Sequence, residues 1–275
     1  MESETRVAYG PVPRGLFDPA LDELSWQLLG DRFLLRGEGQ HFFHYRKGEG
    51  ITIERGPGAD ASEEALWLNG SVYSAIASLN GLLPVHASAV AIGGRVFAFT
   101  GPAGAGKSTL TAALGARELP MFCDDTLVLD LAEPRSITCL PGHKRLKLRE
   151  DALEMTGARR EEKVSCTVDK FFALPAAGDV GEPLPLGELI FLEEGSETSI
   201  APILGAARFA KVHEPNSATW LFTETQSGTR AERFAHLGRL AQQIPMARFM
   251  RPIARDRFGE GVTLMTEYLR QKLAE

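Results

Sequence analysis

The chain has 275 residues, of which 44% are hydrophobic and 24% charged, and its formal net charge is −6. These values are ordinary for a folded protein and exclude a disordered, collagen-like or disulfide-scaffold chain. The acidic balance argues against nucleic acid or an anionic membrane as a general partner. The first segment, "MESETRVAYG", lacks the apolar core of a secretory signal, and no stretch reaches the roughly 18 apolar residues of a membrane span. We therefore expect a cytoplasmic protein.

Residues 1–80 are predicted to form an N-terminal β-rich element. The runs "RFLLRG", "HFFHYRKG" and "ITIERG" alternate and are punctuated by glycine, as in small antiparallel hairpins. The following segment, "SEEALWLNGSVYSAIASLNGLL", begins near Ser62 and carries apolar residues at helical spacing. Those residues are Ala65, Leu68, Val72, Ile76, Leu79 and Leu83. This pattern predicts a linking helix that leads into a second domain over residues 81–275.

The second domain is predicted to be α/β, with a mixed sheet and flanking helices. The runs "HASAVAI" and "RVFAFT" are joined by Gly93-Gly94, which predicts a hairpin. A glycine-rich loop, a helix and the strand-like run "PMFCDDTLVLDL" follow, which gives the order strand, loop, helix, strand. Further strands are expected at "SITCL", "KFFALP" and "ELIFLEE", and helices at residues 230–244 and 262–273.

The loop in "TGPAGAGKSTL" fits the pattern of Gly, four residues, then Gly-Lys-Ser, between a strand and a helix. Glycines let backbone N–H groups point inward, and the helix N-terminus favours an anion. The Lys107 ammonium suits the β- and γ-phosphates of ATP, and the Ser108 hydroxyl suits Mg²⁺. The predicted ATP-binding residues are Gly101, Ala103, Gly104, Ala105, Gly106, Lys107, Ser108 and Thr109.

An aspartate pair, Asp124 and Asp125, follows one helix later at the end of a strand. One carboxylate could organise Mg²⁺ and the other could take a proton from an attacking hydroxyl. Adjacent side chains of a strand point to opposite faces, so both can serve one site only if the strand ends or bends there. The alternative is an ordinary polar turn. The position of the pair after the glycine loop favours the catalytic interpretation.

Positive charge gathers in "PGHKRLKLREDAL". Arg145 and Lys147 could contact the nucleotide or the carboxylate end of a peptide. The alternative is a solvated strand edge, where lysines discourage pairing with another chain. The three cysteines, Cys123, Cys139 and Cys166, have neither CxxC spacing nor an even number, and we predict reduced, buried thiols.

The segment "VHASAVAIGGRVFAFTGPAGAGKSTL", followed by "FCDDTLVLD", resembles the C-terminal catalytic domain of the bacterial HPr serine kinase/phosphorylase family. The match is strongest over residues 80–130. The resemblance implies an HPr-kinase-like core and adds His86 to the active site, together with Lys107. It also implies that Asp124 is the base and Asp125 the partner of Mg²⁺. The hexamers of that family make a homo-oligomer one possible assembly.

The chain departs from the family at two places. Thr109 stands where members usually carry Glu, and the family's Glu-Ile-Arg-Gly segment has no clear equivalent. Both differences argue against phosphorolysis and against HPr as the substrate. A short group that contains "GKST" is more similar, and it includes lasso peptide tailoring kinases, which phosphorylate the C-terminal residue, typically Ser, of a precursor peptide. This resemblance implies an ATP- and Mg²⁺-dependent serine kinase for a peptide or protein.

Other functions stay open, and a kinase of HPr itself is one of them. A nucleotide-dependent regulatory ATPase would keep the loop and would hydrolyse ATP without an acceptor. A kinase of a sugar, a nucleoside or another small hydroxyl compound would have an acceptor pocket that the sequence does not reveal. A degenerate binding module is disfavoured, because no loop residue needed for phosphate chemistry is missing.

Overall fold

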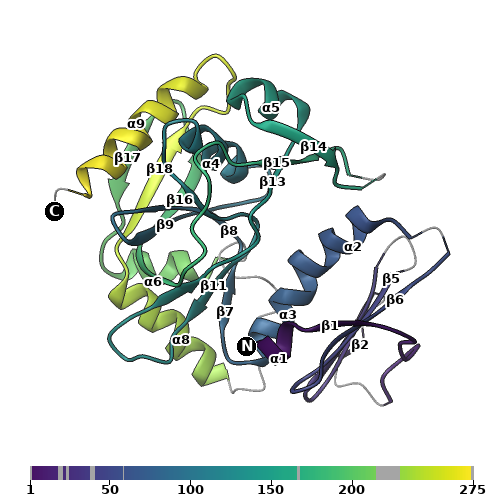
Figure 1. Ribbon diagram of the computed structural model, residues 1–275. Coiled ribbons are helices and arrows are strands. Elements are labelled where there is room, and N and C mark those ends of the chain that lie inside the picture. Colours follow the sequence, from purple (N-terminus) through teal and green to yellow (C-terminus); the bar gives the residue numbers. More distant parts are fainter. Residues whose placement is uncertain are drawn as a thin grey trace.

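The computed structural model of the chain is built on three β-sheets with helices packed against them (Figure 1). It describes residues 2–17, 21–22, 25–37, 41–57, 59–165, 168–214 and 230–273. Cys166 lies outside these ranges. Cys123 and Cys139 are free and buried, as predicted. None of the helices within the described ranges is long and apolar enough to cross a membrane.

The predicted N-terminal β-rich element is a six-stranded sheet, preceded by the short helix α1 (Glu2–Thr5). Its strands lie in the order β1 (Val7–Tyr9), β6 (Gly50–Arg55), β5 (His41–Arg46), β4 (Arg32–Arg36), β3 (Trp26–Leu29) and β2 (Leu21–Asp22). All neighbours are antiparallel except β1 and β6, which are parallel. Side chains alternate along β5, so that Phe43 and Tyr45 are fully buried on the face that packs against a helix.

The linking helix is interrupted by one π-helical turn. It consists of α2 (Ala61–Trp67), the π turn η2 (Leu68–Val72) and α3 (Tyr73–Leu79). Asp60, rather than Ser62, caps it, because the Asp60 side chain accepts the Ser62 N–H at 2.8 Å. The prediction that Leu83 belongs to this helix is wrong. Gly81, with φ +79°, follows the helix end, and Leu83 begins the strand β7 (Leu83–Val85).

The central sheet has nine strands and is mixed. Its main path runs through β10 (Met121–Cys123), β8 (Ala87–Ile92), β9 (Arg95–Thr100), β16 (Leu184–Glu194), β12 (Thr138–Leu140), β11 (Leu127–Asp130) and β7. The strand β18 (Met246–Arg251) also pairs with β16, and β17 (Ser199–Pro202) pairs with β18. The predicted hairpin at Gly93-Gly94 is confirmed as β8 and β9. Because β9, β16 and β18 are mutually parallel, their carboxyl ends lie at the same edge of the sheet.

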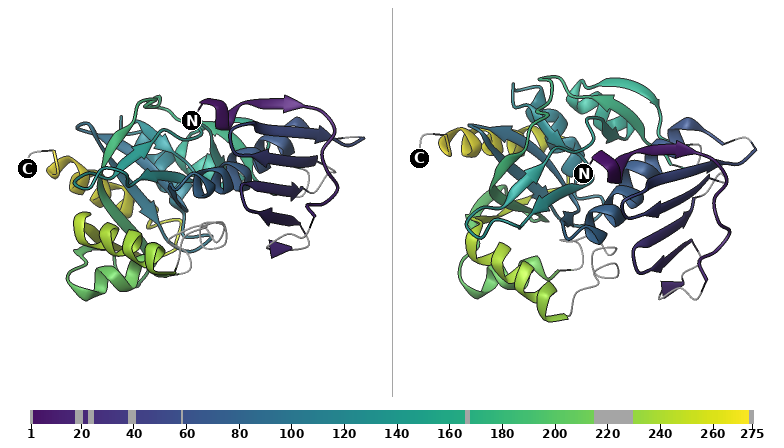
Figure 2. Two further views of the ribbon diagram at one scale, coloured as in Figure 1. Left: turned by 90° about the horizontal axis from the view of Figure 1, so that it is seen from below. Right: turned by 60° about the horizontal axis from the view of Figure 1, so that its bottom comes forward.

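Helices cover both faces of the central sheet. On one face, α4 (Lys107–Gly115) and α9 (Phe258–Gln271) enclose a core that includes Phe99 and Met265. On the other face, α6 (Ala206–Val212) and α8 (Arg230–Gln243) pack over Phe191. The two views of Figure 2 show the N-terminal sheet at one side of this layered body, with the linking helix between them. The two predicted C-terminal helices are confirmed, although α9 begins four residues before the predicted start.

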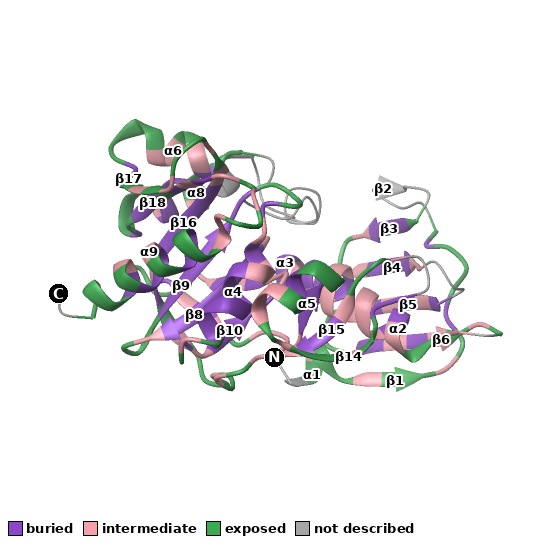
Figure 3. Ribbon diagram, turned by 90° about the horizontal axis from the view of Figure 1, so that it is seen from above, coloured by how far each residue is buried: buried purple, intermediate pink, exposed green. Residues whose placement is uncertain are grey.

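A small third sheet lies beside α4. Its strands are β13 (Leu146–Leu148), β15 (Phe171–Leu174) and β14 (Arg159–Lys163), in that order, with α5 (Glu150–Thr156) between β13 and β14 in sequence. Its core includes Ala112 of α4 and Met121 of β10. Figure 3 shows that the strands of the central sheet are largely buried, while the outer faces of α5, α6 and α9 are exposed. The strands predicted at "SITCL", "KFFALP" and "ELIFLEE" are β12, β15 and β16.

Candidate functional site

The glycine-rich loop connects β9 directly to the N-terminus of α4. Gly101, Gly104 and Gly106 have φ values of +147°, +83° and +79°, which side chains disfavour. A Cβ on Gly101 would lie 2.7 Å from the carbonyl oxygen of Leu192, and one on Gly106 would lie 2.6 Å from Nη2 of Arg251. Backbone conformation therefore favours glycine at all three positions, and at Gly101 the backbone of Leu192 also leaves no space for a side chain.

Lys107 begins α4 and is folded back over the loop. Its ammonium donates to the carbonyl oxygens of Gly101 at 2.9 Å and Pro102 at 3.1 Å, and the residue is only 6% exposed. Burial lowers the pKa of Lys107, while the charges of Asp125 and Asp124 act in the opposite direction. The loop and the aspartate pair lie near each other in the sheet, because β8 pairs with β9 at Thr100, before the loop, and with β10 at Cys123, before the aspartates.

The aspartate pair lies in the short turn between β10 and β11, where the strand structure is interrupted (the strand break). Asp125 has φ +71°, a left-handed conformation that turns its side chain away from the alternation of a strand. Asp124 is 4% exposed, and both of its carboxylate oxygens accept protein hydrogen bonds. Its Oδ1 accepts from the Ser88 hydroxyl at 2.5 Å, and its Oδ2 accepts from the backbone N–H of Lys147 at 3.0 Å. The side chain of Asp125, in contrast, is 36% exposed.

Two basic side chains surround the Asp125 carboxylate. The Lys147 ammonium lies 2.8 Å from Oδ2, and His86 Nδ1 lies 3.7 Å from Oδ1. His86 Nδ1 is also 2.9 Å from the backbone oxygen of Asp125. Strand β7 pairs with β11, and Val85 lies opposite Leu127. This pairing brings His86, which follows β7, close to Asp125, which precedes β11. Burial would raise the pKa of Asp125, but the charge of Lys147 and its hydrogen bond, together with the neighbouring His86 and Lys170, outweigh burial and hold that pKa below its usual value.

The basic side chains of the segment after β12 have different partners. The Lys147 ammonium pairs with the Asp125 carboxylate. The Arg145 guanidinium instead pairs with Glu161 at 2.7 Å and Glu162 at 2.6 Å, and it stacks over the ring of Phe172. The Lys144 ammonium donates to the backbone carbonyls of Phe122, at 2.6 Å, and of Val180. Of the two residues predicted to contact substrate or phosphate, the structure brings Lys147 to the site and engages Arg145 with acidic side chains.

The oxygen donors at the site suit Mg²⁺. These donors are the Ser108 hydroxyl, in the first turn of α4, and the Asp125 carboxylate. Mg²⁺ is commonly held by one or two such groups together with phosphate oxygens and water. Within the described ranges, no three His, Cys, Asp or Glu side chains cluster as a metal site made of protein alone. The donor chemistry therefore fits an ion that arrives with a nucleotide.

Three contacts at the site were missed by sequence reasoning. Ser88 is the polar residue of a buried strand, and this signal could have marked it. Arg251 ends β18 and donates to the Ala105 carbonyl oxygen at 2.6 Å, which anchors the loop from the far end of the chain. Gly70, in the π turn, lies beside Asp125. A glycine inside a helical pattern was the available signal for it.

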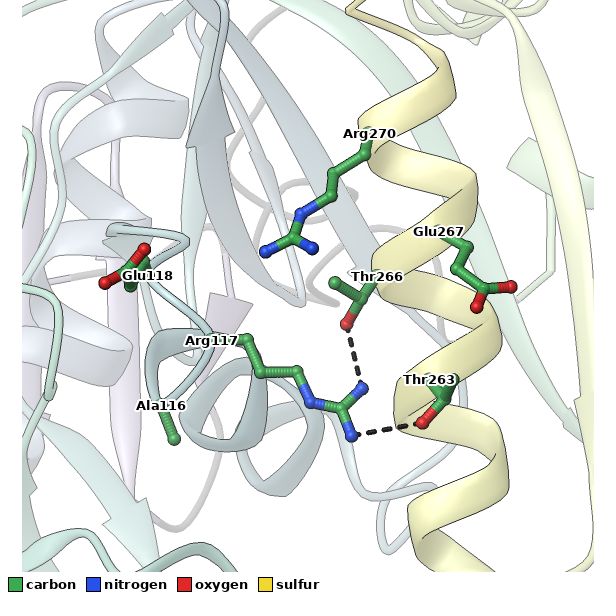
Figure 4. Close-up of a pocket in the computed structure, with 7 residues that line it drawn as sticks. All are labelled: Ala116, Arg117, Glu118, Thr263, Thr266, Glu267 and Arg270. Carbon is green, nitrogen blue, oxygen red and sulfur yellow. Dashed lines mark hydrogen bonds between the residues drawn. The ribbon is translucent and has the colours of Figure 1, made fainter.

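A cavity of about 370 Å³ lies at the other end of α4, away from the loop (Figure 4). It is lined by Ala116, Arg117, Glu118, Thr263, Thr266, Glu267 and Arg270. The Arg117 guanidinium donates to the hydroxyls of Thr266 and Thr263, each at 3.1 Å, and so ties the end of α4 to α9. None of the predicted site residues lines this cavity.

Fold and site together define an α/β chain in which a glycine-rich strand-to-helix loop and a pair of aspartates follow the two strands that flank β8. No family model and no curated protein matches the sequence. Among solved structures, the chain is similar to the Hpr(Ser) kinase/phosphatase from Coxiella burnetii. That similarity has a TM-score of 0.35 and 14% sequence identity, and it covers 69% of this chain and 98% of the other.

Proposed function

We propose that this chain is an ATP- and Mg²⁺-dependent kinase that transfers the γ-phosphoryl group to a hydroxyl of a peptide or protein. One observation carries the proposal: the glycine loop, which follows β9, and the aspartate pair, which follows β10, lie at the same end of β8, because β8 pairs with both strands there. Loop amides and the helix N-terminus favour phosphate, and a nearby carboxylate can accept a hydroxyl proton. In this proposal Gly101 and residues 103–109 hold the nucleotide.

The exposure of the two aspartates supports a division of roles between them. A base must come within hydrogen-bond distance of the acceptor hydroxyl. Asp124 is buried and its oxygens are already engaged by Ser88 and Lys147, whereas Asp125 is partly exposed. We therefore assign the base role to Asp125. Asp124 fixes the strand break and contributes negative charge opposite Lys107.

The transfer step follows from this assignment. The acceptor oxygen attacks the γ-phosphorus, an oxygen–phosphorus bond forms, and the acceptor proton passes to a carboxylate oxygen of Asp125. The bond from the γ-phosphorus to the bridging oxygen breaks, and that oxygen keeps the electron pair and leaves with ADP. Lys107 and Lys147 place positive charge around the phosphoryl group, where such transfers gain most of their acceleration. Mg²⁺, when bound through Ser108, would neutralise phosphate charge.

The first acceptor to test is a peptide that ends in Ser, because the sequence resembles kinases that phosphorylate the C-terminal residue of lasso precursor peptides. Intact-mass analysis of such a peptide after incubation with Mg·ATP should show the gain of one phosphate. If ATP is consumed and the mass of the peptide does not change, the chain acts on another acceptor or is a regulatory ATPase.

Asp125→Asn and Asp124→Asn separate the possible roles of the pair. If Asp125 is the base, Asp125→Asn should lower kcat by roughly 10²- to 10⁴-fold and leave the Kd for Mg·ATP nearly unchanged. If Asp125 instead serves the metal, as the family resemblance implies, this variant should raise the Mg²⁺ concentration needed for half-maximal rate, and Asp124→Asn should abolish transfer. Titrating Mg²⁺ at saturating ATP distinguishes the two results.

A further inference from the structure

The π turn η2 interrupts a helix that otherwise has a regular pattern. Glycine in a helix interior costs up to about 1 kcal/mol relative to alanine, and single π turns are uncommon and often occur at functional sites. Here the turn contains Gly70, whose carbonyl oxygen accepts the Ser74 hydroxyl at 2.7 Å. The chain therefore keeps an unfavourable residue and an irregular turn at one place in this helix.

That place faces the proposed base. A Cβ on Gly70 would lie 3.8 Å from Oδ2 of Asp125. The Ser74 hydroxyl, one turn on, lies 3.4 Å from the Thr126 hydroxyl, next to Asp125. The opposite face of the same helix, with Val72 and Ile76, is buried against the N-terminal sheet. The N-terminal element thus reaches the aspartate pair through one face of its helix.

The helix is partly exposed around the π turn. Residues 65–71 are all partly exposed, and so is the Asp125 side chain that they adjoin. Apart from the helix itself, a Cβ on Gly70 would meet only Oδ2 of Asp125 within 4 Å. A hydroxyl that gives its proton to Asp125 must enter within about 3 Å of that carboxylate.

We infer that the π turn Leu68–Val72 forms one wall of the acceptor site, and that Gly70 provides room for a small hydroxyl side chain of a polypeptide acceptor. This inference rests on the proposed kinase function. It makes Gly70 a residue that determines specificity. It also gives the N-terminal β-rich element a part in selecting the acceptor.

The test uses the full chain and three variants. Gly70→Ala and Gly70→Val place one and three carbons next to the Asp125 carboxylate. Gly259→Ala is the control, because Gly259 also lies in a helix and a Cβ there would meet nothing within 4 Å. The alanine change at Gly70 favours the helical state, so that variant should fold. The probes are two degenerate peptide mixtures, one with a single C-terminal Ser and one with a single C-terminal Thr.

We expect kcat/KM for the Ser mixture to fall about tenfold in Gly70→Ala and further in Gly70→Val, since small misplacements in a reacting site can cost up to about 10²-fold. The loss should be larger for the Thr mixture, because its extra methyl group competes for the same volume. The Kd for Mg·ATP should stay within twofold in every variant. Gly259→Ala should behave like the native chain.

Two outcomes overturn the inference in distinguishable ways. If the native chain phosphorylates the mixtures and the Gly70 variants match it, or lose Ser and Thr transfer equally, the turn is not a steric wall and the kinase proposal still holds. If the native chain binds Mg·ATP but phosphorylates neither mixture, the proposed peptide kinase function fails, and the acceptor wall fails with it.

Discussion

At the scale of single residues, the two neighbouring aspartates of the site differ in their hydrogen-bond partners and in their backbone conformation. Asp124 is enclosed by donors from Ser88 and from the backbone of Lys147. Asp125 adopts a left-handed backbone and meets the side chains of Lys147 and His86. Lys147 therefore contacts both carboxylates, one through its amide and the other through its ammonium.

Lys147→Met should change how transfer depends on pH. The Lys147 ammonium helps to hold the pKa of Asp125 below its usual value, against the effect of burial. Its removal raises that pKa, so a higher pH is needed to ionise the base. The acid limb of the pH profile of kcat/KM should therefore move to higher pH. Lys163→Met, at an exposed position of β14, serves as the control. An unchanged acid limb would show that Asp125 is not the titrating base.

Arg251→Met should weaken nucleotide binding. The buried guanidinium holds the Ala105 carbonyl oxygen at 2.6 Å and packs against Gly106. Loss of a charged donor to a buried acceptor costs about 1 to 3 kcal/mol, and about 1.4 kcal/mol corresponds to tenfold in affinity. Calorimetric titration should therefore give a Kd for Mg·ATP raised about tenfold or more. Arg255→Met, which removes only an exposed pair with Glu154, should bind ATP normally.

At the scale of elements, α2 is attached to the first sheet by a buried carboxylate. Glu64 accepts from the Arg55 guanidinium at 2.6 and 2.9 Å and from the Tyr9 hydroxyl at 2.8 Å. The hydrogen bond from Arg55 is the main cause that lowers the pKa of Glu64, and burial opposes it. One carboxylate thus connects β1, β6 and the helix that carries Gly70.

Glu64→Gln should destabilise the fold by about 1 kcal/mol at pH 7, a modest value because half of the Arg55 side chain is exposed. Since the folded-state pKa is lowered, this stabilisation is present above the unfolded carboxyl pKa and is lost as the pH falls through the folded value. In urea unfolding, the difference between native and variant should therefore shrink in acid. An equal difference at pH 7 and at pH 3 would contradict this. Glu49→Gln, on the surface, is the control.

At the scale of the whole molecule, the linking helix belongs to two packing systems. Its Ile76 side chain is buried in the N-terminal core, while Ser74 and Gly70 face the aspartate break of the central sheet. After α3 the chain continues into β7, which pairs with β11 close to Asp125. The arrangement of the site therefore depends on a core that contains none of its catalytic residues.

Ile76→Ala should lower both stability and activity. Removing this buried side chain should cost about 2 to 5 kcal/mol in the free energy of unfolding. Calorimetry should show a lower Tm, and phosphate transfer should fall at temperatures where the chain is still folded. Leu204→Ala, at a position 72% exposed, should change neither by more than a small amount. A normal transfer rate in folded Ile76→Ala would show that the site is independent of the N-terminal core.

Local patterns in the sequence were enough to predict the hairpin at Gly93-Gly94, the loop before α4 and the terminal helices, because each depends on neighbouring residues. The catalytic interpretation of Asp124 and Asp125 required that the strand end or bend there, and the structure has this strand break. The sequence could not show that Lys147 would meet Asp125, or that Arg251 would hold the loop, since both contacts join distant segments. The π turn was also hidden, because its apolar residues keep ordinary helical spacing.

The anchoring of the loop by Arg251 has a consequence for synthesis of the chain. The loop carbonyl and its guanidinium donor are 146 residues apart in sequence. The hairpins of the first sheet can form soon after they leave the ribosome, because their contacts are local. The loop at residues 101–106 gains its contact with Arg251 only after β18, the last strand of the central sheet in sequence, has been synthesised. A ribosome-bound chain that stops short of residue 251 would carry the complete glycine motif and still lack its anchor.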